Sequence, residues 1–455
     1  MHSCAPALFT DLYELRMLQA YRAEGLTGTA VFTLFVRQLP RNRNVLLACG
    51  LEPVLDYLEH VRFTDDDLAY LRSLDGFTED FVASLRDFRF TGDVHAVPEG
   101  TPVFANEPIL EIVAPLPEAQ LVETFVMNQI HVHTVLASKA MRVVAAARGR
   151  KVVDFGARRT HGVEAANAAA RAFYIAGIDS TSNVLAGKLY GIPVAGTMAH
   201  SYVQVHAGER DAFRAFATMY PGTVLLVDTY DTLDGVRHVI DVVQSARPPL
   251  QVSAVRLDSG DLGTLARETR RLLDAAGLSG IGIFASSGLD EYTIAELMDS
   301  GAPIDGFGVG TGMSVSKDAP ALDIAYKLAE YDGQGLTKLS RHKPILPGRK
   351  QVFRREQHGI CVGDVIGRDG EHLEGRPLLG PVMRGGRRLL GAEDLATIRR
   401  RAAEEIARLP SSVTALAPAE PPYPVTISAA LERYHEDVRG HAHAASAASP
   451  RTDVT

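Results

Sequence analysis

The sequence predicts an α/β protein in which an irregular α/β barrel accompanies a second, smaller α+β domain. Three observations support this prediction. Candidate strands and helices alternate from about residue 150 onward. The segments before residue 150 and after about residue 345 lack this alternation and contain groups of short strand patterns. The chain of 455 residues also exceeds the roughly 100–200 residues of one ordinary domain.

The alternation is clearest between Val152 and Gln204. Val152–Phe155 is an apolar run broken by one acid, Ala165–Ala176 is an alanine-rich helical pattern, and Ile192–Ala195 is a second apolar run. A strand, a helix and a strand within about fifty residues form a βαβ unit, and such units build parallel sheets. Functional side chains of parallel sheets gather at the carboxyl ends of the strands.

Four later apolar runs extend the pattern, with candidate strands starting near Val224, Val252, Ile281 and Ile304. Helical patterns follow, for example at Asp261–Ala276 and Asp290–Ser300, and the apolar run Ala321–Leu328 is expected to close a barrel. Six βα repeats are typical of a barrel or a doubly wound sheet. We therefore place the barrel at residues 150–345.

The flanking segments make up the second domain. Residues 1–149 combine a helix over 8–21, a strand at Val31–Val36, short strands within 92–115 and a long helix at Leu121–Ala147. After residue 345, short strands with glycine turns precede a charged helix at Ala392–Arg408. We expect residues 346–440 to pack on the N-terminal domain and the low-complexity residues 441–455 to form a disordered tail.

The composition excludes several classes of protein. Hydrophobic residues make up 46% of the chain, enough for a large core, yet no apolar run reaches the roughly 18 residues of a membrane helix. The formal net charge of −8 argues against a nucleic-acid binder held by bulk charge. The start of the chain has no signal-peptide pattern, and three scattered cysteines fit a reduced compartment, so we expect a cytoplasmic protein.

Charged side chains follow the predicted strands. Arg158 and Arg159 come directly after the strand that ends at Phe155, and guanidinium groups suit a carboxylate or a phosphate. Thr197 and His200 follow the next apolar run. Two later strands run into acidic loops, which contain Asp228, Asp231, Arg256, Asp258 and Asp261.

Two further loops suit a phosphate. Ser286-Ser287-Gly288 precedes a helix, and residues 308–312 read GVGTG. Glycine-rich turns and helix N-termini present N–H groups to anions, and barrels often build phosphate sites from the loops after the last two strands. Each loop alone is also explained by tight turns, a solvated arginine pair or a histidine at a helix start. Their occurrence after successive strands favours a functional site.

These stretches together resemble the nicotinate phosphoribosyltransferase family. The matching segments include TDLYELRMLQAY (10–21), SKAMRVV (138–144), DFGARRTHG (154–162), GIDSTSNVLAGKLYGIPVAGTMAHSYVQ (177–204), VRLDSGDLG (255–263) and GFGVGT (306–311). Matches cover most of residues 8–355 in order, so the resemblance is specific. It implies the irregular barrel of type II phosphoribosyltransferases.

The resemblance also implies a reaction. Nicotinate is joined to 5-phosphoribosyl 1-pyrophosphate, nicotinate mononucleotide forms and pyrophosphate leaves, which salvages nicotinate for NAD. The family hydrolyses ATP as a co-substrate through a phosphorylated histidine and requires Mg²⁺. A homodimer with sites near its interface is implied as well, so that Tyr13 would serve the barrel of a partner.

The resemblance assigns roles to individual residues. His200 in GTMAH matches the phosphorylated histidine, whereas Tyr13, Thr197 and Arg256 match nicotinate-binding positions. Thr311 in GVGT matches a contact to the phosphate of the phosphoribosyl group.

Chemistry extends these assignments. We expect Arg158 or Arg159 to meet an anion, and Ser287, Gly288 and Gly310 to bind phosphate beside Thr311. Asp258 and Asp261 would stabilise the cationic sugar that forms as the glycosidic bond breaks, or would hold Mg²⁺ together with substrate phosphates.

Two alternatives remain open. Nicotinamide phosphoribosyltransferase shares the fold and the chemistry, but relatives of that kind read about DSYK where this chain has Asp11-Leu12-Tyr13-Glu14. An inactive paralogue that only binds ligands would have lost the histidine or an acidic loop, yet His200, Asp258 and Asp261 are all present.

Overall fold

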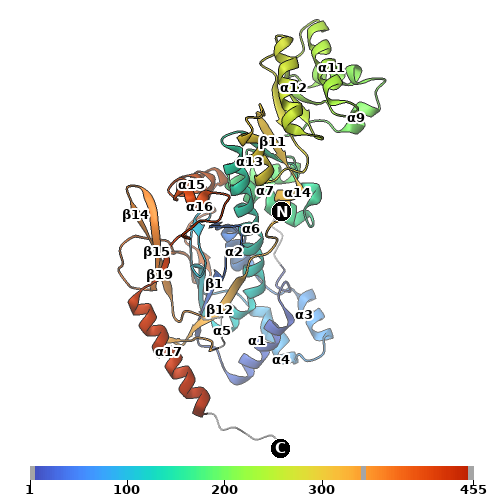
Figure 1. The fold of residues 1–455 in the computed structure, drawn as a ribbon. Helices are drawn as coiled ribbons and strands as arrows, with labels where there is room; N and C mark the ends of the chain where they lie inside the picture. The colour runs from blue at the N-terminus through green and yellow to red at the C-terminus, as the bar shows by residue number, and fades with distance from the viewer. Residues whose placement is uncertain (1–5, 340–344, 449–455) are drawn as a thin grey trace, which may run out of the picture. The chain divides into compact units, whose positions relative to one another are not determined.

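The computed structural model describes residues 6–339 and 345–448 of the chain (Figure 1). The chain divides into two compact units. The barrel unit is Val135–Pro320, and the flanking unit combines Met1–Thr134 with Ala321–Thr455. The division falls inside the long helix α6 (Glu123–Ala147), and thus before the boundary at residue 150 that the sequence suggested.

The barrel unit is built on a six-stranded parallel sheet in the order β7-β6-β11-β10-β9-β8. Its strands are β6 (Lys151–Asp154), β7 (Ser180–Thr181), β8 (Thr223–Leu226), β9 (Val252–Leu257), β10 (Gly282–Ala285) and β11 (Gly306–Val309). The last strand pairs with the first, β11 with β6, so the sheet curls round. Within the described strands the circle stays open between β7 and β8. The predicted irregular α/β barrel is therefore confirmed.

Helices alternate with these strands as the sequence predicted. The helices of this unit after α6 are α7 (Val163–Ile175), α8 (Val184–Tyr190), α9 (His200–Gln204), α10 (Glu209–Met219), α11 (Thr232–Ser245), α12 (Leu262–Ala275), α13 (Glu291–Asp299) and α14 (Thr311–Ser314). Three of them begin at an aspartate whose side chain accepts a backbone N–H of the first turn, namely Asp231, Asp261 and Asp290. An aspartate in this position satisfies N–H groups that have no partner inside the helix.

Two strand predictions need correction. Ile192–Ala195 forms only an isolated bridge, between Val194 and Thr181, because Pro193 has no backbone N–H for a ladder and β7 is only 2 residues long. The run Ala321–Leu328 does not close the barrel. It enters β12 (Ile324–Tyr331), which pairs antiparallel with β1 (Thr29–Val36) in the flanking unit. There the ring of Tyr326 stacks on Phe32 with centroids 4.8 Å apart.

The flanking unit contains two larger sheets. The first has the order β13-β12-β1-β5-β3-β17-β18, and the second has the order β16-β14-β15-β19. Their remaining strands are β3 (Asp93–Ala96), β5 (Pro108–Pro115), β13 (Gln334–Gly335), β14 (Lys350–Gln357), β15 (Ile360–Arg368), β16 (Arg376–Pro377), β17 (Gly380–Arg384), β18 (Arg387–Arg388) and β19 (Val425–Ile427). A short pair of strands, β2 (Leu46–Leu47) and β4 (Pro102–Val103), lies outside both sheets.

Helices of the flanking unit come from both ends of the chain. They are α1 (Leu12–Glu24), α2 (Leu51–His60), α3 (Asp65–Ser73), α4 (Glu79–Ser84), α5 (Leu116–Leu121), α15 (Leu395–Ala407), α16 (Ser411–Thr414) and α17 (Ala429–Ala448). The disordered tail expected from residue 441 is wrong for residues 441–448, which continue α17. Residues 449–455 lie outside the described part of the chain.

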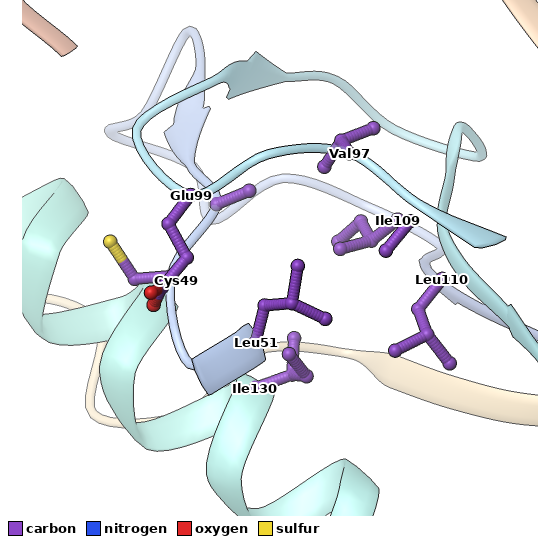
Figure 2. Close-up of a pocket in the computed structure, with 9 residues that line it drawn as sticks. Cys49, Leu51, Val97, Glu99, Ile109, Leu110 and Ile130 are labelled. Atoms are coloured by element: carbon purple, nitrogen blue, oxygen red, sulfur yellow. The ribbon is translucent and has the colours of Figure 1, made fainter. Parts of the chain in front are cut away.

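The core of the flanking unit is tightly packed around α2 and α6. Figure 2 shows Leu51, Ile109 and Ile130 around a cavity of only about 10 Å³, which is at the lower limit for one water molecule. Gly50 allows this close approach. Its backbone has φ 99°, and a Cβ there would lie 2.5 Å from the carbonyl oxygen of Gln129, so a larger residue would force the two helices apart.

Candidate active site

His200 is the first residue of α9 and lies against the loops that follow β8 and β9. Its Nδ1 lies 3.2 Å from the hydroxyl oxygen of Thr229, and its Nε2 lies 3.8 Å from a carboxylate oxygen of Asp258. The imidazole is 42% exposed. The ring is thus oriented by two neighbouring loops and stays open to a reactant.

Asp228 connects the loops after β8 and β9. One carboxylate oxygen accepts the backbone N–H of Asp258 at 2.9 Å and the hydroxyl of Ser259 at 2.6 Å. Its other oxygen is buried without a hydrogen-bond partner. Ser286, at the end of β10, donates its hydroxyl to Asp258. Asp258 is therefore held from both adjacent strands, through its backbone N–H by Asp228 and through its carboxylate by Ser286.

Arg256 is a half-buried cation on β9 beneath these loops. Its guanidinium donates to the carbonyl oxygen of Met198 at 3.0 Å and lies 5.7 Å from the ring centre of Phe155. Burial lowers the pKa of this guanidinium, Asp258 and Asp228 oppose the change, and Arg158 adds to it. Its Nε is buried without a partner. A cation with a free donor beside an aromatic ring is suited to a planar anion.

Arg158 and Arg159 are exposed in a short turn after β6. The preceding Asp154 is buried, and it accepts the N–H of Gly156 at 2.8 Å and the hydroxyl of Thr181 at 2.7 Å. These two hydrogen bonds hold the turn, and burial raises the pKa of Asp154. Arg158 is the member of the pair whose charge reaches Arg256. Thr197 is partly exposed and donates to the carbonyl of Met198 at 3.2 Å, next to the Arg256 contact.

Asp261 caps helix α12. Both carboxylate oxygens accept hydrogen bonds from Thr264, at 3.1 Å from its N–H and at 2.7 Å from its hydroxyl. These bonds lower the pKa of the exposed Asp261 carboxyl. The carboxylate that contacts His200 is thus Asp258, whereas Asp261 has a structural task that the sequence did not reveal.

The two candidate phosphate loops lie against each other. Ser287 and Gly288 both have positive φ, 84° and 63°, which turns the chain sharply before α13. A Cβ on Gly312 would lie 3.0 Å from the carbonyl oxygen of Leu289, so the loop after β11 packs directly on the loop after β10. Gly310 precedes α14, and Thr311, Ser287 and Gly288 are exposed.

Comparison with known proteins places this arrangement in a family. Residues 8–131 match the family model described as the nicotinate phosphoribosyltransferase N-terminal domain. Residues 136–327 match the model described as the quinolinate phosphoribosyl transferase C-terminal domain. A nicotinate phosphoribosyltransferase of Mycobacterium tuberculosis is 56% identical, covering 93% of this chain and 91% of its own. The chain belongs to the nicotinate phosphoribosyltransferase family.

More distant members of the nicotinate phosphoribosyltransferase family agree. The Bacillus subtilis enzyme is 42% identical, over 81% of this chain and 75% of its own. The crystal structure of human nicotinic acid phosphoribosyltransferase matches with a TM-score of 0.84 at 27% identity, covering 94% of this chain and 99% of that chain. The fold and the family that the sequence suggested are both confirmed.

Tyr13, the remaining residue that the family resemblance singled out, lies on α1 in the flanking unit and is 46% exposed. Partial burial and the carboxylates of Glu123 and Glu14 raise the pKa of its hydroxyl. The phenol therefore stays protonated at neutral pH.

Three side chains of this family member reach the site although the sequence gave them no individual role: Asp228 and Ser286, which lie in loops that the sequence indicated, and Thr229. Each follows directly on a strand or stands within three residues of its end, at the same sheet edge as the chosen residues. Their position near a strand end was therefore the sequence signal that could have identified them as site residues. Which of the many polar residues at those ends touch one another depends on the curl of the sheet.

The described residues contain no group of three or more His, Cys, Asp and Glu side chains that would hold a metal ion by themselves. None of the described helices combines the length and the apolar character needed to span a membrane.

Proposed function

We propose that this protein joins nicotinate to 5-phosphoribosyl 1-pyrophosphate, forms nicotinate mononucleotide and pyrophosphate, and serves nicotinate salvage to NAD. The observation that carries the proposal is the convergence of His200, Arg256 and Asp258 at one edge of the barrel sheet, in a chain of this family. The relatives named above support this reaction for the whole chain, because they cover nearly all of it.

Arg256 is proposed to bind the carboxylate of nicotinate. Its unpartnered Nε and the ring of Phe155 at 5.7 Å offer one charged donor and one flat surface, which match the carboxylate and the pyridine ring. Thr197 is proposed to bind nicotinate as well, and one of Arg158 and Arg159 is proposed to meet an anion. Arg158 is favoured, because its positive charge contributes to the lowered pKa of Arg256.

Asp258 is proposed to stabilise the ribose as its bond to pyrophosphate breaks. The sugar then carries positive charge, as in glycoside cleavage, and a fixed carboxylate beside it lowers the barrier. The contacts from Asp228, Ser259 and Ser286 hold the loop and the carboxylate in place. Ser287, Gly288, Gly310 and Thr311 are proposed to bind the 5-phosphate through backbone N–H groups and hydroxyls.

Mg²⁺ is proposed to bind at this edge of the sheet together with the phosphates of the substrate. The ion takes one or two carboxylates from a protein and its other ligands from phosphates and water. Asp258 and Asp261 are the proposed ligands, and the buried free oxygen of Asp228 next to the Asp258 amide is a further acceptor. When bound, Mg²⁺ would neutralise the charge of the pyrophosphate leaving group.

His200 is proposed to accept the terminal phosphoryl group of ATP. An imidazole nitrogen is nucleophilic near neutral pH, and this ring is exposed between the loops after β8 and β9. A bond forms from nitrogen to phosphorus as the bond from phosphorus to ADP breaks, and water later removes the phosphoryl group. The protein would thus belong to the ATP-dependent ligases.

The oligomeric state and the cellular location are proposed from the family resemblance. A homodimer in the cytoplasm is expected, with Tyr13 serving the partner's barrel and with no nucleic acid or membrane as partner.

One assay tests the function. Purified protein is mixed with labelled nicotinate, 5-phosphoribosyl 1-pyrophosphate and Mg²⁺, with and without ATP, and parallel reactions contain nicotinamide or quinolinate. Labelled nicotinate mononucleotide that increases with ATP supports the proposal. Faster conversion of nicotinamide would favour that alternative, and tight binding of nicotinate without product would indicate an inactive paralogue.

A further inference from the structure

The barrel unit contains a buried charged cluster that is separate from the proposed site residues. Lys139 on α6 contacts Glu291 and lies 2.7 Å from a carboxylate oxygen of Asp318. Arg142, one turn further along α6, contacts the same Glu291 at 3.0 Å. The side chains of Lys139 and Glu291 are 2% and 0% exposed, so the protein keeps these charges away from water.

The two acids belong to the segments that follow the proposed phosphate loops. Glu291 is the first residue of α13, directly after the loop that contains Ser287 and Gly288. Asp318 lies four residues after α14, the short helix that begins at Thr311. One ammonium group therefore joins the two segments, and the Gly312 contact to Leu289 brings the loops themselves together.

Arg142 fixes the α13 side of the cluster more firmly. Its guanidinium also donates to the hydroxyl of Tyr292 at 2.9 Å and lies 5.5 Å from the ring centre of that residue. Arg142 and Glu291 thus form a pair that stands without Lys139. What Lys139 alone adds, among the contacts described here, is the link from Glu291 to Asp318.

We propose that Lys139 is a positioning residue for phosphate binding: it sets the spacing between the loop after β10 and the loop after β11. This inference rests on the proposed function, because it takes these loops as the site for the 5-phosphate. Backbone N–H donors bind an anion well only when their geometry is fixed before it arrives. A buried ammonium with two carboxylate partners provides such a fixed spacing, because either carboxylate would lose its contact with that ammonium if its segment moved away.

The cluster offers a variant that separates positioning from simple charge loss. Lys139→Met alone removes the cation between two acids of the barrel unit and leaves excess negative charge there, which by itself destabilises the fold. Lys139→Met with Asp318→Asn removes one positive and one negative charge and leaves the Arg142–Glu291 pair in place. Lys139→Arg keeps the cation. Arg148→Gln is a matched control, because Arg148 and Asp299 form an exposed pair that also joins the end of α6 to α13.

The first measurement needs no catalysis. Hydrogen exchange of the full-length protein is followed in residues 286–290 and 310–318 and compared with helices α11 and α12. We expect the double variant to exchange at least about threefold faster in both loops and unchanged in the two helices, with Lys139→Arg close to wild type. Unchanged exchange in the loops, or a rise everywhere at once, would overturn the proposal.

The second measurement connects the cluster to the reaction. For the double variant we expect KM for 5-phosphoribosyl 1-pyrophosphate to rise at least about tenfold, KM for nicotinate to change less than about twofold, and Arg148→Gln to behave as wild type. Equal KM values for 5-phosphoribosyl 1-pyrophosphate in the double variant and wild type would overturn the role in phosphate binding. A wild type without transferase activity would instead reject the proposed function, and the exchange data would then decide the positioning role alone.

Discussion

Asp228 accepts the backbone N–H of Asp258 at 2.9 Å. The two acids stand at the ends of neighbouring strands, 30 residues apart in the chain, and the bond fixes the direction in which the Asp258 loop leaves β9. The same carboxylate oxygen also holds Ser259. Asp228 thus supports the loop that presents Asp258 to His200.

Asp258→Asn is expected to lower turnover by about 10²-fold, because a charge placed beside a developing cation is lost. Asp228→Asn should lower turnover less, since both hydrogen bonds go to one carboxylate oxygen and the amide oxygen of asparagine can still accept them. Steady-state rates at saturating Mg²⁺ and the melting temperature check both variants. Normal turnover of Asp258→Asn would make it an ordinary loop residue.

Asp261→Asn distinguishes capping from catalysis. Asparagine caps helices about as well as aspartate, so the α12 start should survive and the melting temperature should stay within about 2 °C. A loss of turnover with unchanged ATP binding would then reflect the lost charge near the ribose or Mg²⁺. Full activity of this variant would mean that Asp261 only caps α12 and takes no part in catalysis.

His200→Ala should abolish ATP hydrolysis and the stimulation of product formation by ATP. A slow transfer without ATP should remain, because Asp258 and the phosphate loops are unchanged. The measurement is acid-labile, base-stable phosphate on the protein after incubation with γ-labelled ATP. Equal labelling of wild type and variant would redirect attention to His161 or His206, of which His206 already contacts the carbonyl of Tyr202 at 2.7 Å.

Nicotinate should be preferred over nicotinamide by at least tenfold in kcat/KM. The loss of a carboxylate–arginine contact in a partly buried site costs roughly 2–5 kcal/mol. Arg256→Gln should remove most of this preference and should affect nicotinate far more than nicotinamide. Equal use of both substrates by wild type would contradict the assignment of Arg256.

Glu14 predicts a pH dependence of stability. Burial raises the pKa of this carboxyl from its ordinary 4.5 to about 7, although hydrogen bonds from Thr10 and Thr124 oppose the change. Between these values the folded chain keeps a proton that the unfolded chain has lost, so stability falls as the pH rises through this window. Glu14→Gln should therefore gain about 1–3 kcal/mol relative to wild type between pH 5 and pH 8.

Denaturant unfolding at both pH values measures that difference. Glu24→Gln, an exposed position on the same helix, should show no such trend. A constant difference between Glu14→Gln and wild type across the pH range would mean that the carboxyl ionises normally in the folded protein.

Removal of residues 441–455 should leave the melting temperature and activity unchanged within error. Helix α17 is anchored before that point, by the buried side chains of Leu431 and Val438 and by Tyr434, whose hydroxyl accepts the N–H of Gly335 at 3.0 Å. The side chains of residues 441–444 are largely exposed. A large fall in stability would show that the end of the helix docks.

The sequence determined the local features of this protein. Apolar runs of four to six residues followed by helical patterns predicted β6, β8, β9, β10 and β11 close to their observed positions. Such patterns are local, because they depend only on residues that are neighbours in the chain. Aspartates at the strand ends served both as helix caps and as site candidates, so Asp258 and Asp261 could be chosen together and not told apart. The order of the motifs was enough to indicate the family.

Tertiary structure decided what depends on distant partners. An apolar run such as Ala321–Leu328 pairs equally well with a barrel strand or with β1, and packing of Tyr326 on Phe32 belongs to the second choice. The curl of the sheet selected Asp228, Thr229 and Ser286 from the many polar residues at strand ends. The contact between Lys139 and Glu291 joins residues 152 positions apart, and no local pattern encodes a pairing that forms only when the chain has folded.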